Sequence, residues 1–137
     1  MSMRMRIVLP LLIWLPLAGT AIAQERSDNP LNDDPETVVD TLHVKAGKED
    51  ELAKVMARAW AAYRKFDMVL AEPHLLMRGM DDAGRPFFVE ILTWKDHNKP
   101  DHAPPEVKKI WAEMEALCEK RDGHRGIVFY EVHPVKP

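Results

Sequence analysis

The densest group of side chains able to bind a metal or move a proton lies in one loop, TWKDHNKPDHAPPEV at residues 93–107. Within this loop the pair Asp96-His97 recurs as Asp101-His102. Carboxylates and imidazoles are common metal ligands and common general acids and bases. Their spacing lacks the i, i+4 placement of a helical metal motif. The residue types are suited to metal binding or proton transfer, but their spacing does not indicate which of the two, if either, occurs.

The same loop also has the features of a helix start. The sequence Pro-Pro-Glu at 104–106 suits the first helical turn, where proline is tolerated and an acidic side chain meets the positive end of the dipole. We therefore expect Asp96, His97 and Asp101 to shape this lead-in, and we assign no metal site. Metal binding by this loop is kept as a third hypothesis. His102 stays a candidate functional residue.

A second group of polar side chains falls on alternating positions of the expected strands. Ionisable groups in an apolar interior shift their pKa and often mark binding or proton transfer, and a neutral histidine near a glutamate can act as a general base. The alternative is that they are satisfied polar groups of a dimer interface. The group contains Thr41, His43, His74, Arg78, Glu90, Trp94, Glu131 and His133.

The elements that must position these residues follow from apolar periodicity and turn residues. The order strand, helix, strand, strand, helix, strand predicts an α+β, ferredoxin-like βαββαβ fold, with a four-stranded antiparallel sheet and two helices on one face. Gly84 is expected to take a positive φ in the hairpin turn. The expected strands are 37–44, 72–80, 85–94 and 127–135, and the expected helices are 49–66 and 104–121.

Both faces of the predicted sheet carry large apolar side chains. A sheet with one solvated face should alternate between apolar and polar residues. In the third strand, however, Phe87, Val89 and Ile91 alternate with Phe88 and Leu92. Since two helices cover only one face, we expect a homodimer that packs its sheets face to face.

The N-terminus reads as an export signal. Two arginines precede a short apolar run that Pro10 and Pro16 interrupt, which favours a signal peptide at 1–23 over a membrane anchor. A polar leader at 24–36 and one domain at 37–135 follow. We therefore expect an exported, periplasmic or secreted protein that is not held at a membrane after cleavage.

The mature domain is mildly acidic. Loss of Arg4 and Arg6 lowers the formal net charge from −3 to −5, which does not suit nucleic-acid binding. Cys118 is the one cysteine of the sequence, so no disulfide forms within the chain. It lies on the apolar stripe of the second predicted helix, and we expect it to be buried.

Four stretches of the chain carry a family resemblance. VKAGKEDELAKV, FFVEILTWKD, HAPPEVKKIW and GIVFYEVHPV resemble the dimeric α/β-barrel superfamily, in its antibiotic-biosynthesis-monooxygenase-like branch. The resemblance covers about residues 37–135. It implies the ferredoxin-like fold and a homodimer. The activities that it implies include cofactor-free oxygenation of polyketides and quinols and the degradation of haem.

The haem-degrading members provide a residue-by-residue comparison. They use an asparagine on the first strand, a tryptophan ending the third and a histidine on the second helix. Trp94 matches the tryptophan, and His102 matches the histidine approximately. The asparagine position falls on or near Asp40, and an ionised carboxylate cannot donate a hydrogen bond. This difference counts against haem degradation.

Two functions follow as hypotheses. The first is a cofactor-independent, monooxygenase-like oxidoreductase that binds a small apolar or aromatic molecule. Trp94 would form a pocket wall, and His102, His43 or Glu90 would handle the proton. The alternative is a non-catalytic binding or assembly module of the same fold. No phosphate-binding glycine loop or other cofactor motif occurs in the sequence, and no cofactor is expected.

Overall fold

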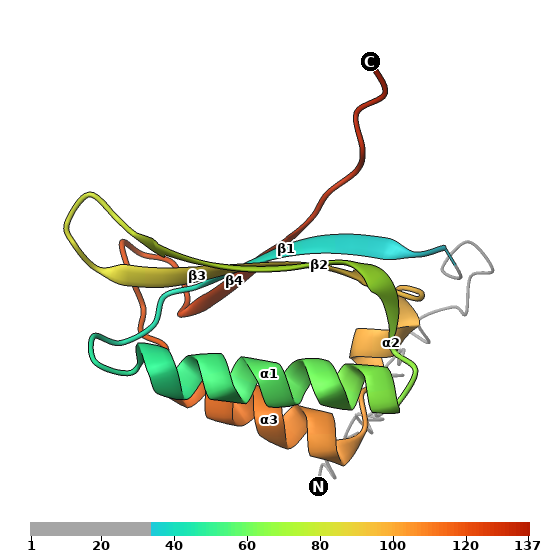
Figure 1. Ribbon diagram of the computed structural model, residues 1–137, viewed down its shortest axis with the longest axis horizontal. Coiled ribbons are helices and arrows are strands. Elements are labelled where there is room, and N and C mark those ends of the chain that lie inside the picture. The colour runs from blue at the N-terminus through green and yellow to red at the C-terminus, as the bar shows by residue number, and fades with distance from the viewer. Residues whose placement is uncertain (1–33) are drawn as a thin grey trace, which may run out of the picture.

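The computed structural model describes residues 34–137. The predicted signal peptide at 1–23 and most of the predicted leader at 24–36 lie outside these residues. The chain forms an α+β, ferredoxin-like domain with two layers, in which α1 and α3 both lie on one face of an antiparallel sheet (Figure 1). Its elements are β1 Glu36–Leu42, α1 Glu49–Lys65, β2 Val69–Met80, β3 Pro86–Trp94, α2 Asn98–Asp101, α3 Pro105–Ala116 and β4 Ile127–Glu131.

The strand order β2-β3-β1-β4 results from two crossovers on the same side of the sheet. β1 pairs antiparallel with both β3 and β4, and the β2–β3 hairpin completes the sheet. Gly84 lies in the hairpin turn with φ +74°, as predicted. The core fills the space between the inner face of the sheet and the two long helices. Leu42, Leu52, Met56, Leu92 and Val107 are among its fully buried side chains.

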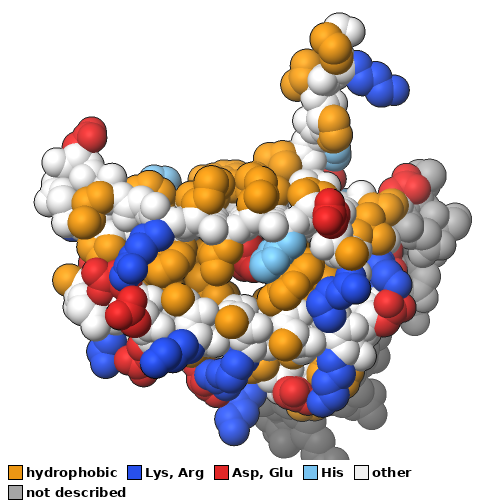
Figure 2. All heavy atoms as spheres, in the orientation of Figure 1, with side chains coloured by type: hydrophobic (Ala, Val, Ile, Leu, Met, Phe, Trp, Pro, Cys, Tyr) orange, Lys and Arg blue, Asp and Glu red, His pale blue; other side chains and the backbone are white. Residues whose placement is uncertain are grey.

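The outer face of the sheet has no covering layer within the described residues (Figure 1). Pairing places Val39, Ile91 and Tyr130 on this face, together with Leu75 and Met77 of β2. Leu75 is 51% exposed and Met77 is 49% exposed, and apolar side chains gather along this side of the molecule in Figure 2. The prediction that both faces are apolar is therefore confirmed.

The second long helix ends earlier than predicted. The predicted helix spans 104–121, but α3 ends at Ala116. The next residues leave the helix to pair with the segment after β1, where the Lys45 N–H donates to the Leu117 carbonyl at 2.9 Å. Cys118 is buried as expected, but it forms a β-bridge with Val44 instead of standing on a helix. Tertiary pairing thus replaces the last helical turn.

The last strand is also shorter than predicted. It ends at Glu131, and the Val132 N–H makes a final bond to the Thr37 carbonyl at 2.9 Å. Pro134 has no N–H to extend the ladder. The residues from 131 to the C-terminus are exposed, and Figure 1 shows the tail leaving the sheet. Of the helices described, none has the length and apolar character needed to cross a membrane.

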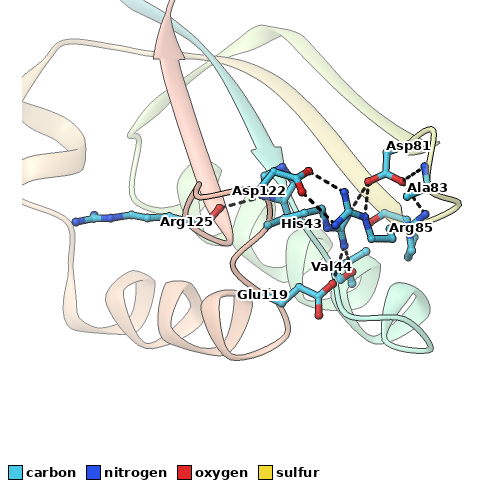
Figure 3. A network of polar contacts seen from close by, with 10 residues as sticks. His43, Val44, Asp81, Ala83, Arg85, Glu119, Asp122 and Arg125 are labelled. Carbon is cyan, nitrogen blue, oxygen red and sulfur yellow. Dashed lines mark hydrogen bonds and ion pairs between the residues drawn. The ribbon is translucent and has the colours of Figure 1, made fainter.

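One end of the domain is tied together by a buried arginine. Arg121 is 4% exposed and donates to the Pro86 carbonyl at 2.9 Å, and to the Val44 carbonyl and the Glu119 carboxylate at 3.0 Å each. It also lies 3.6 Å from the carboxylate of Asp81 in the hairpin turn. Figure 3 shows this network, which joins the end of β1, the hairpin and the connection between α3 and β4.

Candidate active site

A cavity of about 820 Å³ opens between β1, β4, α3 and the loop that contains α2. Its size falls in the range of small-molecule sites. The wall combines aromatic rings, several carboxylates and two histidines. The residues that line it are Glu36, Val38, Asp40, Tyr63, Trp94, His97, Asn98, Pro100, Asp101, His102, Trp111, Met114, Glu115, Arg125, Ile127 and Phe129.

Three aromatic residues from three elements form one wall. The Tyr63 ring lies 5.0 Å from the Trp94 ring, and the Trp111 ring lies 6.3 Å from both. Trp111 Nε1 donates to the Tyr63 hydroxyl at 2.5 Å, which fixes both rings. Burial raises the pKa of Tyr63 well above its usual range, so the phenol stays protonated. This wall suits a flat, apolar or aromatic ligand.

Asp40 places a carboxyl in the same cavity. It stands on β1 between Val38 and Leu42, so that its side chain points from the sheet toward the helices. Its carboxyl makes no hydrogen bond or ion pair with any residue from 34 to 137. Burial, and secondarily repulsion from Glu90, raises the pKa of Asp40 to about 7. A carboxyl in this state is available to a ligand as a proton acceptor near neutral pH.

Glu90 lies directly behind Asp40. The two residues are opposed across the β1–β3 pair, and Glu90 is 1% exposed and does not line the cavity. Burial raises the pKa of Glu90 to about 7. Its carboxyl lies 2.9 Å from Nε2 of His74, whose ring stacks on Trp60 with centroids 3.6 Å apart. The cavity carboxyl therefore has a second carboxyl and an imidazole behind it.

The loop at residues 93–107 forms the cavity mouth. Asp96 accepts the backbone N–H groups of Asn98 and Lys99 at 2.8 and 3.0 Å, so it starts the short helix α2. The ring of His102 is exposed, and its Nδ1 lies 3.1 Å from the carbonyl of Asn98. Trp94 and His102 both line the cavity, as hypothesised.

A different set of donors gathers at this mouth. His97 Nδ1 lies 3.1 Å from a carboxylate oxygen of Glu36, and donor atoms of these two residues and Glu131 lie within 4.8 Å of one another. Two carboxylates and one imidazole are a set that divalent cations accept. Of the four Asp and His side chains in the loop, His97 alone belongs to this set.

The strand register corrects the predicted group of polar residues. His74, Arg78, Glu90, Trp94 and Glu131 do face the helices, but Thr41 pairs with Val89 on the outer face.

His43 stands after the end of β1 and outside the cavity lining. Its backbone N–H donates to the Gly126 carbonyl at 2.7 Å, and its ring lies 3.1 Å from the Arg125 carbonyl (Figure 3). These contacts hold the loop before β4.

Asp40 was not among the residues predicted to handle the proton. A short stretch of the sequence around Asp40 could have identified it. In the run Thr-Val-Val-Asp-Thr-Leu at 37–42, the inward positions are 38, 40 and 42, and the middle one carries a charge. A carboxyl at the centre of an apolar stripe is unfavourable unless a partner or a function compensates for it.

Solved structures share this architecture. No protein-family model matches the sequence, and a search of the curated proteins finds no match. SnoaB, a cofactor-independent oxygenase from Streptomyces nogalater, is 23% identical, with a TM-score of 0.55 over 76% of this chain and 98% of that one. The chain has the fold of the antibiotic biosynthesis monooxygenases.

Two further structures agree with this assignment of the fold. A protein named antibiotic biosynthesis monooxygenase is 16% identical, with a TM-score of 0.56 over 74% of this chain and 99% of that one. PA3566 from Pseudomonas aeruginosa gives 16% identity and a TM-score of 0.56 over 77% and 98% of the two chains. The predicted ferredoxin-like fold and the resemblance to this branch are confirmed.

Proposed function

We propose that the chain is an exported, homodimeric, cofactor-independent oxygenase of small aromatic molecules. The observation that carries the proposal is Asp40, a carboxyl without a protein partner among residues 34–137, on the wall of an aromatic-lined cavity. The activity of SnoaB, which has this fold, supports the same class of reaction. Export follows from the predicted signal peptide, and the homodimer from the apolar outer face of the sheet.

The chemistry requires only a base and dioxygen. The Asp40 carboxylate takes a proton from an acidic C–H of the ligand, so that the C–H bond breaks and an O–H bond forms on Asp40. The ligand keeps the electron pair as an enolate, which reduces dioxygen and forms a C–O bond. The resulting peroxide takes up a proton, and loss of the second C–H proton then breaks the O–O bond, forms the C=O bond and releases hydroxide, which leaves as water. A base with a pKa near the working pH is both deprotonated and basic enough for this step. The aromatic wall would hold the flat enolate.

Anthrone is a suitable probe, because its doubly benzylic CH2 group loses a proton to give an aromatic enolate. With one dioxygen it yields anthraquinone and water. Purified protein should consume oxygen with anthrone in the presence of EDTA, and Asp40→Asn should lower kcat by about 100-fold or more. Asp82→Asn, in the exposed hairpin turn, is the matched control and should behave like the wild type.

Binding can be separated from turnover by tryptophan fluorescence. Anthraquinone, the product, should quench the emission of wild-type protein and of Asp40→Asn alike, because the aromatic wall is intact in both. Quenching without oxygen uptake in the wild type would indicate a binding module of the same fold. Oxygen uptake that EDTA abolishes would contradict the cofactor-independent reaction.

A further inference from the structure

We propose that Glu90 and His74 form a proton exit route that connects Asp40 in the cavity with solvent at the β2 edge of the sheet. The three side chains come from β1, β3 and β2, which are neighbours in the sheet order. The inference rests on the proposed function, in which Asp40 receives a proton from the ligand. It adds a path by which that proton leaves.

The first step of the route joins the two carboxyls. Asp40 and Glu90 are directly opposed in the antiparallel β1–β3 pair, and both face the helices. In such pairs the Cβ atoms are about 5 Å apart, so the carboxyl groups are neighbours. In the described part of the chain, no ion pair joins either of them to a lysine or an arginine. Without a nearby cation, this pair favours a bound proton over two negative charges.

The second step joins Glu90 to His74. A Glu90 oxygen and His74 Nε2 lie 2.9 Å apart, which is hydrogen-bond distance. The Glu90 side chain is 1% exposed and the His74 side chain 22%, so the imidazole is the member of the route that meets water. The Trp60 ring stacks on the imidazole with an interplanar angle of 4° and fixes its plane. An irregularity in β2 between Val69 and His74 precedes the histidine.

Burial brings the proton affinities of the two carboxyls close together. Burial raises the pKa of Asp40 and of Glu90 to about 7, and burial lowers the pKa of His74. The two carboxyls therefore bind a proton about equally well, and the lowered pKa of His74 favours release of a proton from its imidazolium. When the two carboxyls rotate into hydrogen-bond contact, the O–H of Asp40 breaks as an O–H forms on Glu90. That bond breaks as an N–H forms on His74, and the imidazolium then releases a proton to water.

The side chains that pack around Asp40, Glu90 and His74 do not compete for the proton. From α1, the Tyr63 hydroxyl lies near both carboxyls and stays protonated, and Trp60 covers His74. On β2 the next inward charge is Arg78, which pairs with Asp50 at 3.4 Å and lies over the Phe88 ring. A ligand in the cavity displaces the water that would otherwise carry the proton from Asp40 out through the mouth. A rear route would regenerate the base while the cavity is filled.

The connection can be tested without a substrate. In NMR spectra of the full protein, the ring signals of His74 should shift as the carboxyl pair titrates near pH 7. This response should disappear or move in Asp40→Asn, although Asp40 does not touch the imidazole. Identical His74 titration curves in the wild type and Asp40→Asn would overturn the route, whether or not the protein oxidises anthrone.

The use of the route is tested by anthrone turnover in weakly buffered solution. His74→Phe keeps a ring on Trp60 and removes the nitrogens, and Glu90→Gln keeps the shape of the carboxyl. Each should lower kcat by about tenfold or more, less than the loss of the base itself. Added imidazole should restore part of the rate of His74→Phe. His124→Phe, at an exposed turn position, should match the wild type.

The outcomes separate the two proposals. An unchanged kcat in His74→Phe, or a loss that imidazole does not restore and that leaves the pH profile unchanged, would overturn the route. Coupled NMR titrations in a protein that takes up no oxygen with anthrone would support the connection and contradict the oxygenase.

Discussion

Asp40 and Glu90 face each other across the β1–β3 pair, and among the described residues neither carboxyl forms an ion pair with a lysine or an arginine. Burial of two such groups costs stability when they ionise. Two apolar residues at these positions would give a more stable core. The pair is therefore more simply explained by the chemistry of the adjacent cavity than by packing.

The Glu90→Gln substitution should change how stability depends on pH. The pKa of Glu90 is raised from 4.5 to about 7 in the folded protein, so between these values the folded state holds a proton that the unfolded state has lost. Stability from this group is thus lost as the pH rises toward 7. Glutamine cannot ionise. Glu90→Gln should match the wild type near pH 4 and exceed it by up to about 3 kcal/mol at pH 8.

Urea unfolding at the two pH values measures this difference. His74 acts in the opposite sense, because its lowered pKa makes stability rise as the pH rises through about 6.5. Because His74 contacts Glu90, the substitution is also compared in a His74→Phe background, where this contribution is absent from both proteins. Glu72→Gln, on the exposed part of β2, is the control and should follow the wild-type curve. A Glu90→Gln protein that is less stable than the wild type at pH 8 would contradict the argument.

The His102→Ala substitution tests the residue that the sequence favoured for proton transfer. The ring of His102 is exposed at the cavity mouth and is held by the carbonyl of Asn98 at 3.1 Å. Because Asp40 is the base of the proposed reaction, His102→Ala should raise KM for anthrone severalfold and leave kcat unchanged. Steady-state kinetics would show this. A loss of kcat comparable to that of Asp40→Asn would indicate that His102, and not Asp40, is the general base.

Apolar periodicity identified the order of the elements and the two faces of the sheet, because burial requires one stripe on each helix and alternation on each strand. It could not choose the register between strands, and the register decides that Asp40, and not Thr41, stands beside Glu90. Apolar periodicity also could not predict where α3 ends, because the residues after the helix pair with the segment after β1, with a β-bridge between Cys118 and Val44. Contacts between distant segments decide both points.

The Arg121→Met substitution should destabilise the domain. Arg121 is buried and satisfies the carbonyls of Val44 and Pro86, and methionine would leave both without their donor. We expect the free energy of unfolding to fall by about 3 kcal/mol. Lys120→Met, at the exposed neighbouring position, should change it little. Urea denaturation measures both, and equal stabilities would mean that the network in Figure 3 contributes no net stability.

Two methionines on the same strand test the predicted dimer. Met77 points to the outer face of the sheet, whereas Met80, at the hairpin end, lies on the other side of the strand. Both are well exposed, at 49% and 65%. If a second copy covers the outer face, Met77→Glu places a charge in the interface and Met80→Glu does not. Light scattering at micromolar concentration should then report a dimer for the wild type and Met80→Glu, and a monomer for Met77→Glu.

Comparing Met77→Glu with Met80→Glu distinguishes a specific interface from nonspecific aggregation. An apolar surface that only promotes aggregation would respond to a new charge at either methionine, since both contribute exposed apolar area. An interface formed by the outer face responds at Met77 alone, because burial of an unpaired carboxylate between two sheets is strongly unfavourable. A wild-type protein that is monodisperse and monomeric would contradict the dimer directly, and the outer face would then need another partner.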